Sequence, residues 1–314
     1  MELIIFVGIP ASGKSTKSTL YRKLGYEVLS SDDIRNELMP GVKLDVLSPD
    51  QRARLHAKTF ETVRRRASEA LKRGQSVVVD ATNLSRKRRI SFLKCFRRFP
   101  CVKKCLLFLT PVDVCMERNR KRTGNARVPD DAMYRMLCNF ECPNYWEGWD
   151  EILPVAYEEP YTFPFYEIKD FHQDNSHHTL TLDAHLEMTA RFCRDRHCNP
   201  AVNKVARYHD IGKLYTKQYQ NSLGEITKEA HYYGHDSFGA YLYITEMCCG
   251  KEISPQKFRD ILYETSLINC HMYPMYRWKD GIPTQKDMEL FGTEFLSDLM
   301  ALHQADIAAH KEVL

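Results

Sequence analysis

The pattern GxxxxGKS/T at residues 8–15 constrains the fold of this 314-residue chain more than any other feature. It follows a short apolar run at Glu2–Val7 and precedes helix-forming residues that continue to Leu24. Strand, glycine-rich loop and helix is the setting of a phosphate-binding loop. Its glycines let backbone N–H groups turn toward phosphate oxygens, and the helix N-terminus adds its positive dipole end. A chance glycine-rich turn would not need both flanking elements, so the sequence predicts a P-loop.

The residues of this loop predict binding of ATP with Mg²⁺. Lys14 is placed to neutralise charge on the β- and γ-phosphates, and the Ser15 hydroxyl is placed to ligate Mg²⁺. The residues expected to bind ATP are Gly8, Pro10, Ala11, Ser12, Gly13, Lys14, Ser15 and Thr16.

Three further apolar runs, at Glu27–Ser30, 75–80 and 102–110, alternate with helix-compatible stretches. Buried strands that alternate with helices are typical of a mostly parallel sheet. We therefore expect the first half of the chain to be an α/β domain.

Two charged residues follow the second of these strands, at the edge where parallel sheets place their ligands. Asp32 and Arg35 are three residues apart and share one face of the helix expected there. The carboxylate can take a proton from an acceptor hydroxyl while the arginine holds an anionic acceptor. The alternative is a helix N-cap formed by Asp32 or Asp33, and the spacing alone leaves both open.

Charge and histidine are divided unevenly along the chain. Residues 1–160 hold 29 basic and 20 acidic residues, a net charge of +9, whereas residues 161–314 hold 16 and 21, a net charge of −5. Only one of the 12 histidines lies in the first half. A basic half suits a polyanionic partner, and an acidic, histidine-rich half suits metal binding.

Two groups of arginines in the first half have different explanations. Arg118 and Arg122 precede a Gly- and Pro-containing segment, so we expect them in a lid over the transferring phosphate. The basic run 86–89 is explained equally well as a solvated helix face.

Residues 1–153 resemble the 5′-hydroxyl polynucleotide kinase module of RNA repair. The resemblance rests on four segments in order: the P-loop, residues 31–35, residues 80–83 with the arginines after them, and residues 118–129. It implies that Asp32 is the general base, that Arg35 contacts the 3′ phosphate of the acceptor, and that the lid arginines contact the donor phosphates. The residues it implies for catalysis are Asp32, Lys14, Arg35, Arg118 and Arg122, and those for acceptor binding are Arg35, Asp80 and Asn83.

The second half has largely helical spacing, over residues 179–196, 200–210, 237–248, 254–270 and 286–313. Side chains of the kinds that bind divalent transition metals lie in these helices or at their ends. They are His185, His209, Asp210, His235, His271 and Asp306. A single histidine of this kind is usually a surface or core residue, but a series joined by an adjacent His-Asp pair is poorly explained in that way.

Residues 174–314 resemble the HD phosphohydrolase superfamily, an all-α metal-dependent fold, most clearly at residues 206–213. The resemblance implies a basic metal set of His185, His209, Asp210 and Asp306. It implies that His235 and His271 are the extra pair of dinuclear members, so that one or two metals such as Mn, Fe, Co, Ni or Zn bind. His177, His178 and Lys213 are candidate contacts to substrate phosphate, with polar loop residues and helix-end capping as the alternatives.

The two resemblances together predict a P-loop kinase-like domain at 1–157, a linker at 158–173 and an HD domain at 174–314. They imply a bifunctional enzyme that heals nucleic-acid ends, RNA being favoured over DNA. One domain would phosphorylate a 5′-hydroxyl with ATP, and the other would remove a terminal 2′,3′-cyclic, 2′ or 3′ phosphate. No ligase-type lysine motif is present, so a sealing ligase would be a separate partner. Two alternatives remain: a nucleoside or nucleotide kinase fused to an HD nucleotidase, and a kinase with a metal-free HD binding module.

Other features of the sequence concern location. No run of 18 apolar residues is present, so no membrane span is expected. The first residues lack a basic segment and a cleavage site, and the 11 scattered cysteines are odd in number. We therefore expect a cytoplasmic protein with reduced thiols.

Overall fold

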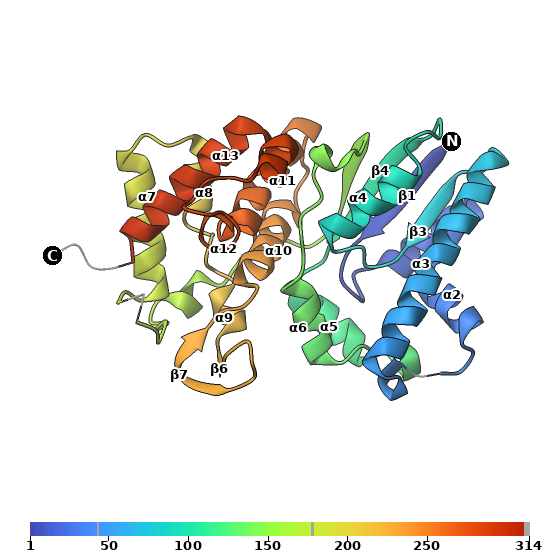
Figure 1. The fold of residues 1–314 in the computed structure, drawn as a ribbon, viewed down its shortest axis with the longest axis horizontal. Helices are drawn as coiled ribbons and strands as arrows, with labels where there is room; N and C mark the ends of the chain where they lie inside the picture. The colour runs from blue at the N-terminus through green and yellow to red at the C-terminus, as the bar shows by residue number, and fades with distance from the viewer. Residues whose placement is uncertain (43, 177–178, 311–314) are drawn as a thin grey trace. The chain divides into compact units, whose positions relative to one another are not determined.

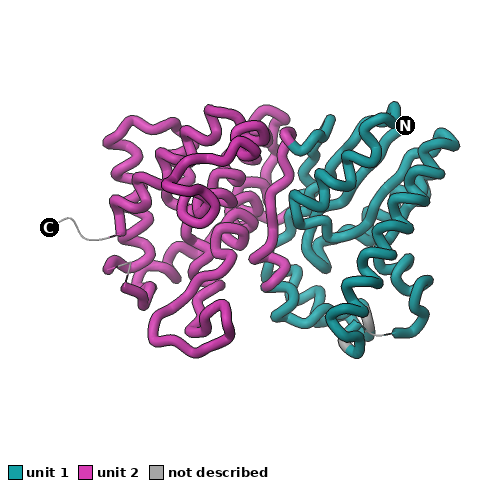
Figure 2. Tube along the Cα trace, in the orientation of Figure 1, with its two compact units in different colours: residues 1–134, 147–157 teal, residues 135–146, 158–314 magenta. Residues whose placement is uncertain are grey.

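The computed structural model describes residues 1–42, 44–176 and 179–310, and the chain divides into two compact units (Figure 2). The first unit comprises Met1–Tyr134 and Glu147–Tyr157, and the second comprises Arg135–Trp146 and Glu158–Leu314. The chain thus passes between the units more than once. The predicted single division after residue 157 did not place the segment Arg135–Trp146 in the second unit.

The segment 158–173 is not a separate linker, and that expectation is wrong. Phe163 and Ile168 are buried, and the Phe163 N–H donates to the Glu246 carboxylate over 3.3 Å. Phe163 and Ile168 therefore anchor this segment in the core of the second unit. The Trp146 ring likewise lies 5.4 Å from the Phe291 ring. This contact explains why the segment Arg135–Trp146 belongs to the second unit.

The first unit is built on five parallel strands in the spatial order β2-β3-β1-β4-β5 (Figure 1). The strands are β1 Glu2–Val7, β2 Glu27–Ser30, β3 Val77–Asp80, β4 Val102–Leu109 and β5 Glu151–Ala156. The first four are the predicted ones. Strand β5 was not predicted because it contains Pro154 and is only partly buried, which is tolerated at a sheet edge and masks the pattern of a central strand.

The helices of this unit connect the strands and position the loops at their carboxyl ends. They are α1 Lys14–Lys23, α2 Ser31–Leu38, α3 Pro49–Lys72, α4 Arg86–Cys95, α5 Val112–Arg120 and α6 Asp130–Leu137, which continues into the second unit. The rings of Phe6 and Phe108 meet edge to face at 5.0 Å in the core between β1 and β4. Ser30 and Asp80 are register partners, so the ends of β2 and β3 meet at one edge of the sheet.

A buried ion pair joins α4 to the segment before β5. The Arg89 guanidinium donates to both carboxylate oxygens of Glu147, at 2.8 and 2.6 Å, and to the carbonyl oxygens of Asn83 and Leu84. Both side chains are fully buried. Part of the 86–89 run is therefore structural rather than a solvated face, and Arg89 fixes the loop after β3.

We expect Glu147→Gln to lower the free energy of unfolding of the first unit by about 3–5 kcal/mol, because it leaves the buried Arg89 charge without its counterion. Glu69→Gln is a matched control, since it removes the exposed Arg65–Glu69 pair and should cost less than about 1 kcal/mol. Urea unfolding followed by circular dichroism measures both. Equal losses in the two variants would show that the buried pair has no special weight.

The second unit is mainly helical but not all-α, which corrects the expectation. Its helices are α7 Leu182–Asp195, α8 Pro200–Val205, α9 Lys213–Thr216, α10 His235–Cys248, α11 Pro255–Cys270, α12 Tyr273–Tyr276 and α13 Gln285–Ala308. An antiparallel hairpin, β6 Gln218–Gln220 and β7 Ile226–His231, follows α9. Helix α8 ends at Val205, five residues before the predicted end, so the His-Asp pair lies in turns.

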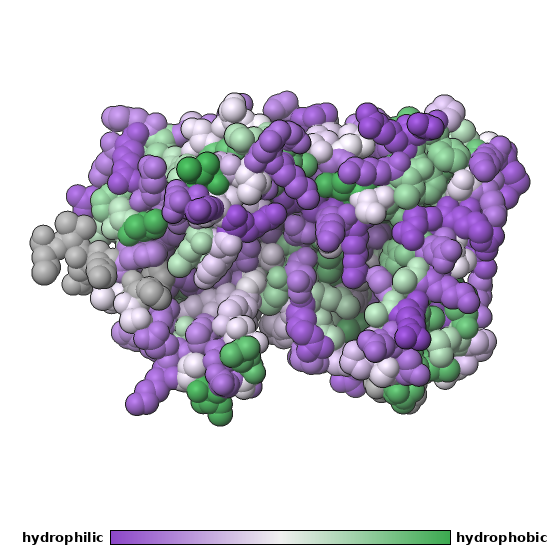
Figure 3. Space-filling view, in the orientation of Figure 1, coloured by the Kyte–Doolittle hydropathy of each residue, from purple (hydrophilic) through white to green (hydrophobic). Residues whose placement is uncertain are grey.

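The hairpin exposes apolar side chains near its turn. Leu223 is 82% and Ile226 89% exposed, and the hydrophobic patch at the hairpin position is visible in Figure 3. These strands bury little apart from Ala230, which is why hydrophobic periodicity did not reveal them.

Within the described part of the chain, no helix combines the length and the apolar character that crossing a membrane requires.

Candidate active sites

Two positions in the P-loop require glycine. A Cβ at Gly8 would lie 2.8 Å from Phe108 Cβ and 2.9 Å from Ser12 Oγ, so a side chain would clash with the strand behind the loop. Gly13 has φ +96°, a conformation that side chains disfavour. The loop thus turns tightly from β1 into the N-terminus of α1, the backbone setting that phosphate binding requires.

Lys14 is buried at the centre of this loop. Its ammonium donates to the carbonyl oxygens of Gly8, at 2.9 Å, and Ile9, at 2.6 Å. Burial lowers the pKa of Lys14 to about 8, despite the opposing charges of Asp80 and Asp32. The charges that act on this lysine are those of Asp80, Cys115, Arg122 and Asp32, and all but Cys115 are residues that the sequence predicted for the site.

The predicted acceptor residues take distinct positions. Asp80 accepts a hydrogen bond from Ser18 Oγ at 2.6 Å, and burial raises its pKa. Asp32 lies in the first turn of α2 and pairs with Arg35, and its carboxylate is 85% exposed. Ser30 provides the N-cap of α2, so Asp32 is not needed for that purpose. Its accessible carboxylate can reach an incoming hydroxyl.

Asn83 has a structural contact that the sequence did not indicate. It adopts φ +46°, and its amide donates to the Phe6 carbonyl oxygen at 2.8 Å. This bond ties the loop after β3 to the end of β1. Its implied role in acceptor binding stays a prediction.

The lid arginines lie at the end of α5 in a segment held by a residue that sequence reasoning missed. Buried Asn119 exchanges two hydrogen bonds with the Val128 backbone, at 2.6 and 3.0 Å. Arg118 stacks over the Tyr157 ring at 5.3 Å, and Arg122 donates to the Ala126 carbonyl oxygen. Asn119 therefore closes the loop that carries the arginines.

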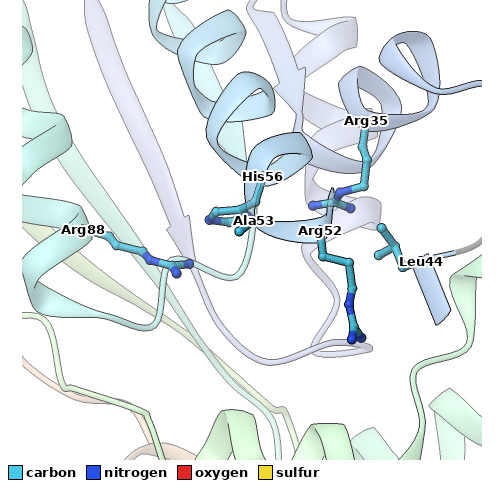
Figure 4. Close-up of a pocket in the computed structure, with 6 residues that line it drawn as sticks. All are labelled: Arg35, Leu44, Arg52, Ala53, His56 and Arg88. Carbon is cyan, nitrogen blue, oxygen red and sulfur yellow. The ribbon is translucent and has the colours of Figure 1, made fainter. Parts of the chain in front are cut away.

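A basic hollow of about 380 Å³ opens beside the predicted acceptor site (Figure 4). Its lining residues are Arg35, Leu44, Arg52, Ala53, His56 and Arg88. Sequence reasoning missed Arg52 and His56, although their spacing of four places them on one face of α3. Burial, followed by the charges of Arg88 and Arg35, lowers the pKa of His56.

In the second unit, four buried histidines present the same nitrogen to a common centre. The Nδ1 atom of each bonds to a backbone carbonyl: His185 to Ala309 at 3.1 Å, His209 to Ala206 at 2.9 Å, His235 to Tyr232 at 2.6 Å and His271 to Ile268 at 2.8 Å. A carbonyl can only accept, so each Nδ1 carries a proton and each Nε2 faces the centre, where it offers its lone pair to a metal once it is deprotonated. Hydrogen bonds of this kind orient histidines that bind metal.

Two carboxylates complete the cluster. Asp210 Oδ2 lies 3.3 Å from His185 Nε2 and 3.5 Å from His209 Nε2, while its Oδ1 lies 3.1 Å from His235 Nε2 and 3.4 Å from His271 Nε2. Asp306 Oδ1 lies 3.1 Å from His185 Nε2. The predicted ligands thus form two groups that share Asp210: His185, His209, Asp210 and Asp306 in one, and Asp210, His235 and His271 in the other.

This donor set fits divalent transition metals. Asp306 Oδ1 is buried and has no hydrogen-bond partner, so its lone pairs can bind a cation. Burial alone would lower the pKa of His209, but the charges of Asp210 and Asp306 outweigh it and raise the pKa to about 10. The cluster therefore attracts positive charge strongly, and imidazole with carboxylate is a ligand set for Mn, Fe, Co, Ni or Zn.

A glycine lets the two ligand groups meet. A Cβ at Gly212 would lie 2.0 Å from the His235 carbonyl oxygen, so only glycine allows the turns after α8 to pack on α10. Lys213 then places its ammonium 2.6 Å from Asp210 Oδ2 and 2.8 Å from Gln173 Oε1. Its position beside the cluster suits a contact to phosphate as well as to the carboxylate. His177 and His178 lie outside the described residues.

Comparison with known proteins covers about half of the chain. Residues 3–143 match the family model for an AAA domain, in agreement with the P-loop and the parallel sheet. Heterogeneous nuclear ribonucleoprotein U-like protein 2 of Homo sapiens is 24% identical over 161 residues, 48% of this chain and 21% of that protein. Transcription factor bHLH140 of Arabidopsis thaliana is 28% identical over 158 residues, 48% of this chain and 15% of that protein. The chain thus spans about a fifth or less of the curated relatives that it matches.

Solved structures with similarity to the chain include a candidate kinase from Chloroflexus aurantiacus, 22% identical with a TM-score of 0.42 over 49% of this chain and 84% of that chain. A gluconokinase from Sinorhizobium meliloti is 22% identical with a TM-score of 0.33 over 49% and 81%.

We expect the affinity for MgATP to fall as pH rises above 8. Phosphate favours the ammonium form of Lys14, and because its pKa is about 8 in the free protein, binding at higher pH requires proton uptake. The affinity should fall by up to about tenfold per pH unit. Calorimetry between pH 7 and 10, in buffers of different ionisation enthalpy, measures both affinity and proton uptake. Weak, pH-independent binding by Lys14→Met is the expected control result, whereas wild-type binding without proton uptake would contradict the prediction.

We expect Asp210→Asn to lose all metal from the cluster, because both ligand groups share this carboxylate. His235→Gln should lose only the metal of its own group. Metal analysis after reconstitution with Mn²⁺ or Zn²⁺ tests this, with circular dichroism to verify folding. Asp298→Asn is a matched control, since it makes the same chemical change at a carboxylate bonded to Tyr263. Full metal content in Asp210→Asn would refute the shared-ligand arrangement.

Proposed function

We propose that this protein heals nucleic-acid ends with two separate activities. The first unit transfers the γ-phosphate of ATP to a 5′-hydroxyl, and the second hydrolyses a terminal 2′,3′-cyclic, 2′ or 3′ phosphate. The observation that carries the proposal is the presence in one chain of a P-loop beside an exposed Asp32–Arg35 pair and of a six-residue His/Asp cluster. RNA is the favoured substrate, because its cleavage leaves ends that need both reactions.

In the proposed kinase reaction, Asp32 accepts the proton of the 5′-hydroxyl as its oxygen attacks the γ-phosphorus. The bond from the γ-phosphorus to the β–γ bridging oxygen breaks, and ADP leaves. Lys14 and the lid arginines hold the phosphates and stabilise the charge spread over the transferring group. Arg35 orients the Asp32 carboxylate and holds the acceptor. Mg²⁺ held by Ser15 would neutralise charge on the donor phosphates.

In the proposed hydrolase reaction, the buried histidines and carboxylates hold one or two metals, and His235 and His271 belong to the second site. Divalent metals at such sites supply hydroxide at neutral pH and polarise phosphate oxygens. The protein contributes fixed ligand directions, since every Nδ1 is bonded to the backbone. Lys213 contributes a cation beside the ligands that can hold a phosphate oxygen.

A defined RNA substrate tests both activities at once. The purified chain is given an oligoribonucleotide with a 5′-hydroxyl and a 3′ or 2′,3′-cyclic phosphate, together with ATP, Mg²⁺ and Mn²⁺. We expect Lys14→Ala to lower 5′-phosphorylation by about 10²–10³-fold or more, and Asp32→Asn to lower kcat by about 10²–10⁴-fold, with 3′-dephosphorylation retained. Asp210→Ala should abolish only the dephosphorylation.

The same assay separates the alternatives. A variant that keeps the reaction assigned to its own site would refute that assignment. Phosphorylation of nucleosides with a KM that is insensitive to salt, and none of RNA, would favour a small-molecule kinase. Retained RNA phosphorylation without any metal-dependent phosphatase activity would favour a non-catalytic second unit. A ligase that joins the healed ends would be a separate protein.

A further inference from the structure

The basic hollow beside Asp32 has a composition that the proposed phosphate transfer does not itself require. Arg35 from α2, Arg52 and His56 from α3 and Arg88 from α4 extend toward the same space (Figure 4). The other lining residues that the structure describes are Leu44 and Ala53, and none of the described lining residues carries a carboxylate. Arg35 is already paired with Asp32, so the charges in this space that an anion would compensate are those of Arg52 and Arg88.

Two of these arginines lack a protein counterion within the described residues. On α3, Arg65 pairs with Glu69 and Arg66 with Glu37, whereas Arg52 on the same helix and Arg88 on α4 form no ion pair within the described residues. The neighbouring Arg89 forms a buried ion pair with Glu147. Arg88, unlike Arg89, lines the hollow.

We propose that this hollow is a second anion subsite, which holds a phosphodiester of the acceptor strand beyond the phosphate that Arg35 contacts. The inference rests on the proposed kinase function, and it adds that the enzyme binds a strand with at least two phosphates rather than a single nucleotide. The planar guanidinium groups of Arg52 and Arg88 match the paired oxygens of a phosphodiester. Leu44 and Ala53 supply an apolar wall against which a sugar or base can lie.

The position of the hollow connects it to the reacting hydroxyl. Arg35 both pairs with Asp32, the proposed base, and lines the hollow. A strand whose 5′-hydroxyl lies at Asp32 can therefore continue past Arg35 to Arg52 and Arg88. The His56 ring, packed 4.7 Å from Phe60, forms part of the wall between them.

The test compares two acceptors, a nucleoside 3′-monophosphate and a 5′-hydroxyl oligoribonucleotide of ten residues. We expect Arg52→Ala and Arg88→Ala to lower the ratio of kcat/KM for the long over the short acceptor by at least about tenfold each, mainly through KM. The slope of log(kcat/KM) against log[salt] for the long acceptor should decrease in magnitude by about 1 per arginine removed. Arg65→Ala, on the same helix, is the charge-matched control and should change neither quantity.

A direct measurement of oligonucleotide binding distinguishes an error in the proposed subsite from an error in the proposed kinase function. Fluorescence anisotropy without ATP measures binding of the same oligonucleotide to all variants. Weaker binding by Arg52→Ala and Arg88→Ala than by Arg65→Ala supports the subsite even if no 5′-phosphorylation is found, in which case only the kinase assignment fails. Active wild-type kinase with an unchanged acceptor ratio in both variants overturns the subsite alone. Displacement by inorganic phosphate as effectively as by oligonucleotide would show a site for free phosphate and would also overturn it.

Discussion

The buried carboxylate of Asp210 is the constraint on which the second unit depends. Each of its oxygens faces a separate pair of histidines, and a buried charge is costly unless it is compensated. Lys213 provides one compensating charge at 2.6 Å. The local fold brings these groups together. Helix α8 ends at Val205 and the chain turns through Gly212, which packs so closely on His235, the first residue of α10, that a side chain at position 212 would clash.

The first unit uses the opposite electrostatics. Its centre is a buried ammonium, Lys14, among backbone dipoles, and the surplus of basic residues divides into two kinds. Some are structural, as Arg89 is when it ties α4 to Glu147. Others lie near the P-loop or the basic hollow, as Arg122 and Arg88 do. The net charge of +9 in residues 1–160 therefore overstates how much positive charge is directed at ligands.

The sequence predicted those parts that local pattern and side-chain chemistry determine. Four buried strands and the P-loop agree with the structure, and the six His/Asp side chains predicted to bind metal come together in it, because continuous apolar runs and rare His/Asp combinations are visible without three-dimensional context. Strand β5 and the hairpin β6–β7 were missed because edge and exposed strands lack a strong hydrophobic period. The basic hollow was missed because its arginines come from three helices that only tertiary packing assembles, and the 158–173 segment was misjudged because isolated aromatic anchors have no period.

Charge within the His/Asp cluster is compatible with the phosphate substrate proposed for the second unit. When each Nε2 lone pair binds metal the four imidazoles are neutral, so the two carboxylates at −2 and the Lys213 ammonium at +1 give the ligand shell a net charge of −1. One divalent ion would change this to +1 and two would change it to +3. A buried excess of that size needs an anion with several oxygens, and a terminal phosphate monoester provides one. The same count explains the presence of Lys213: it limits the negative charge before metal binds and adds to the attraction for phosphate afterwards.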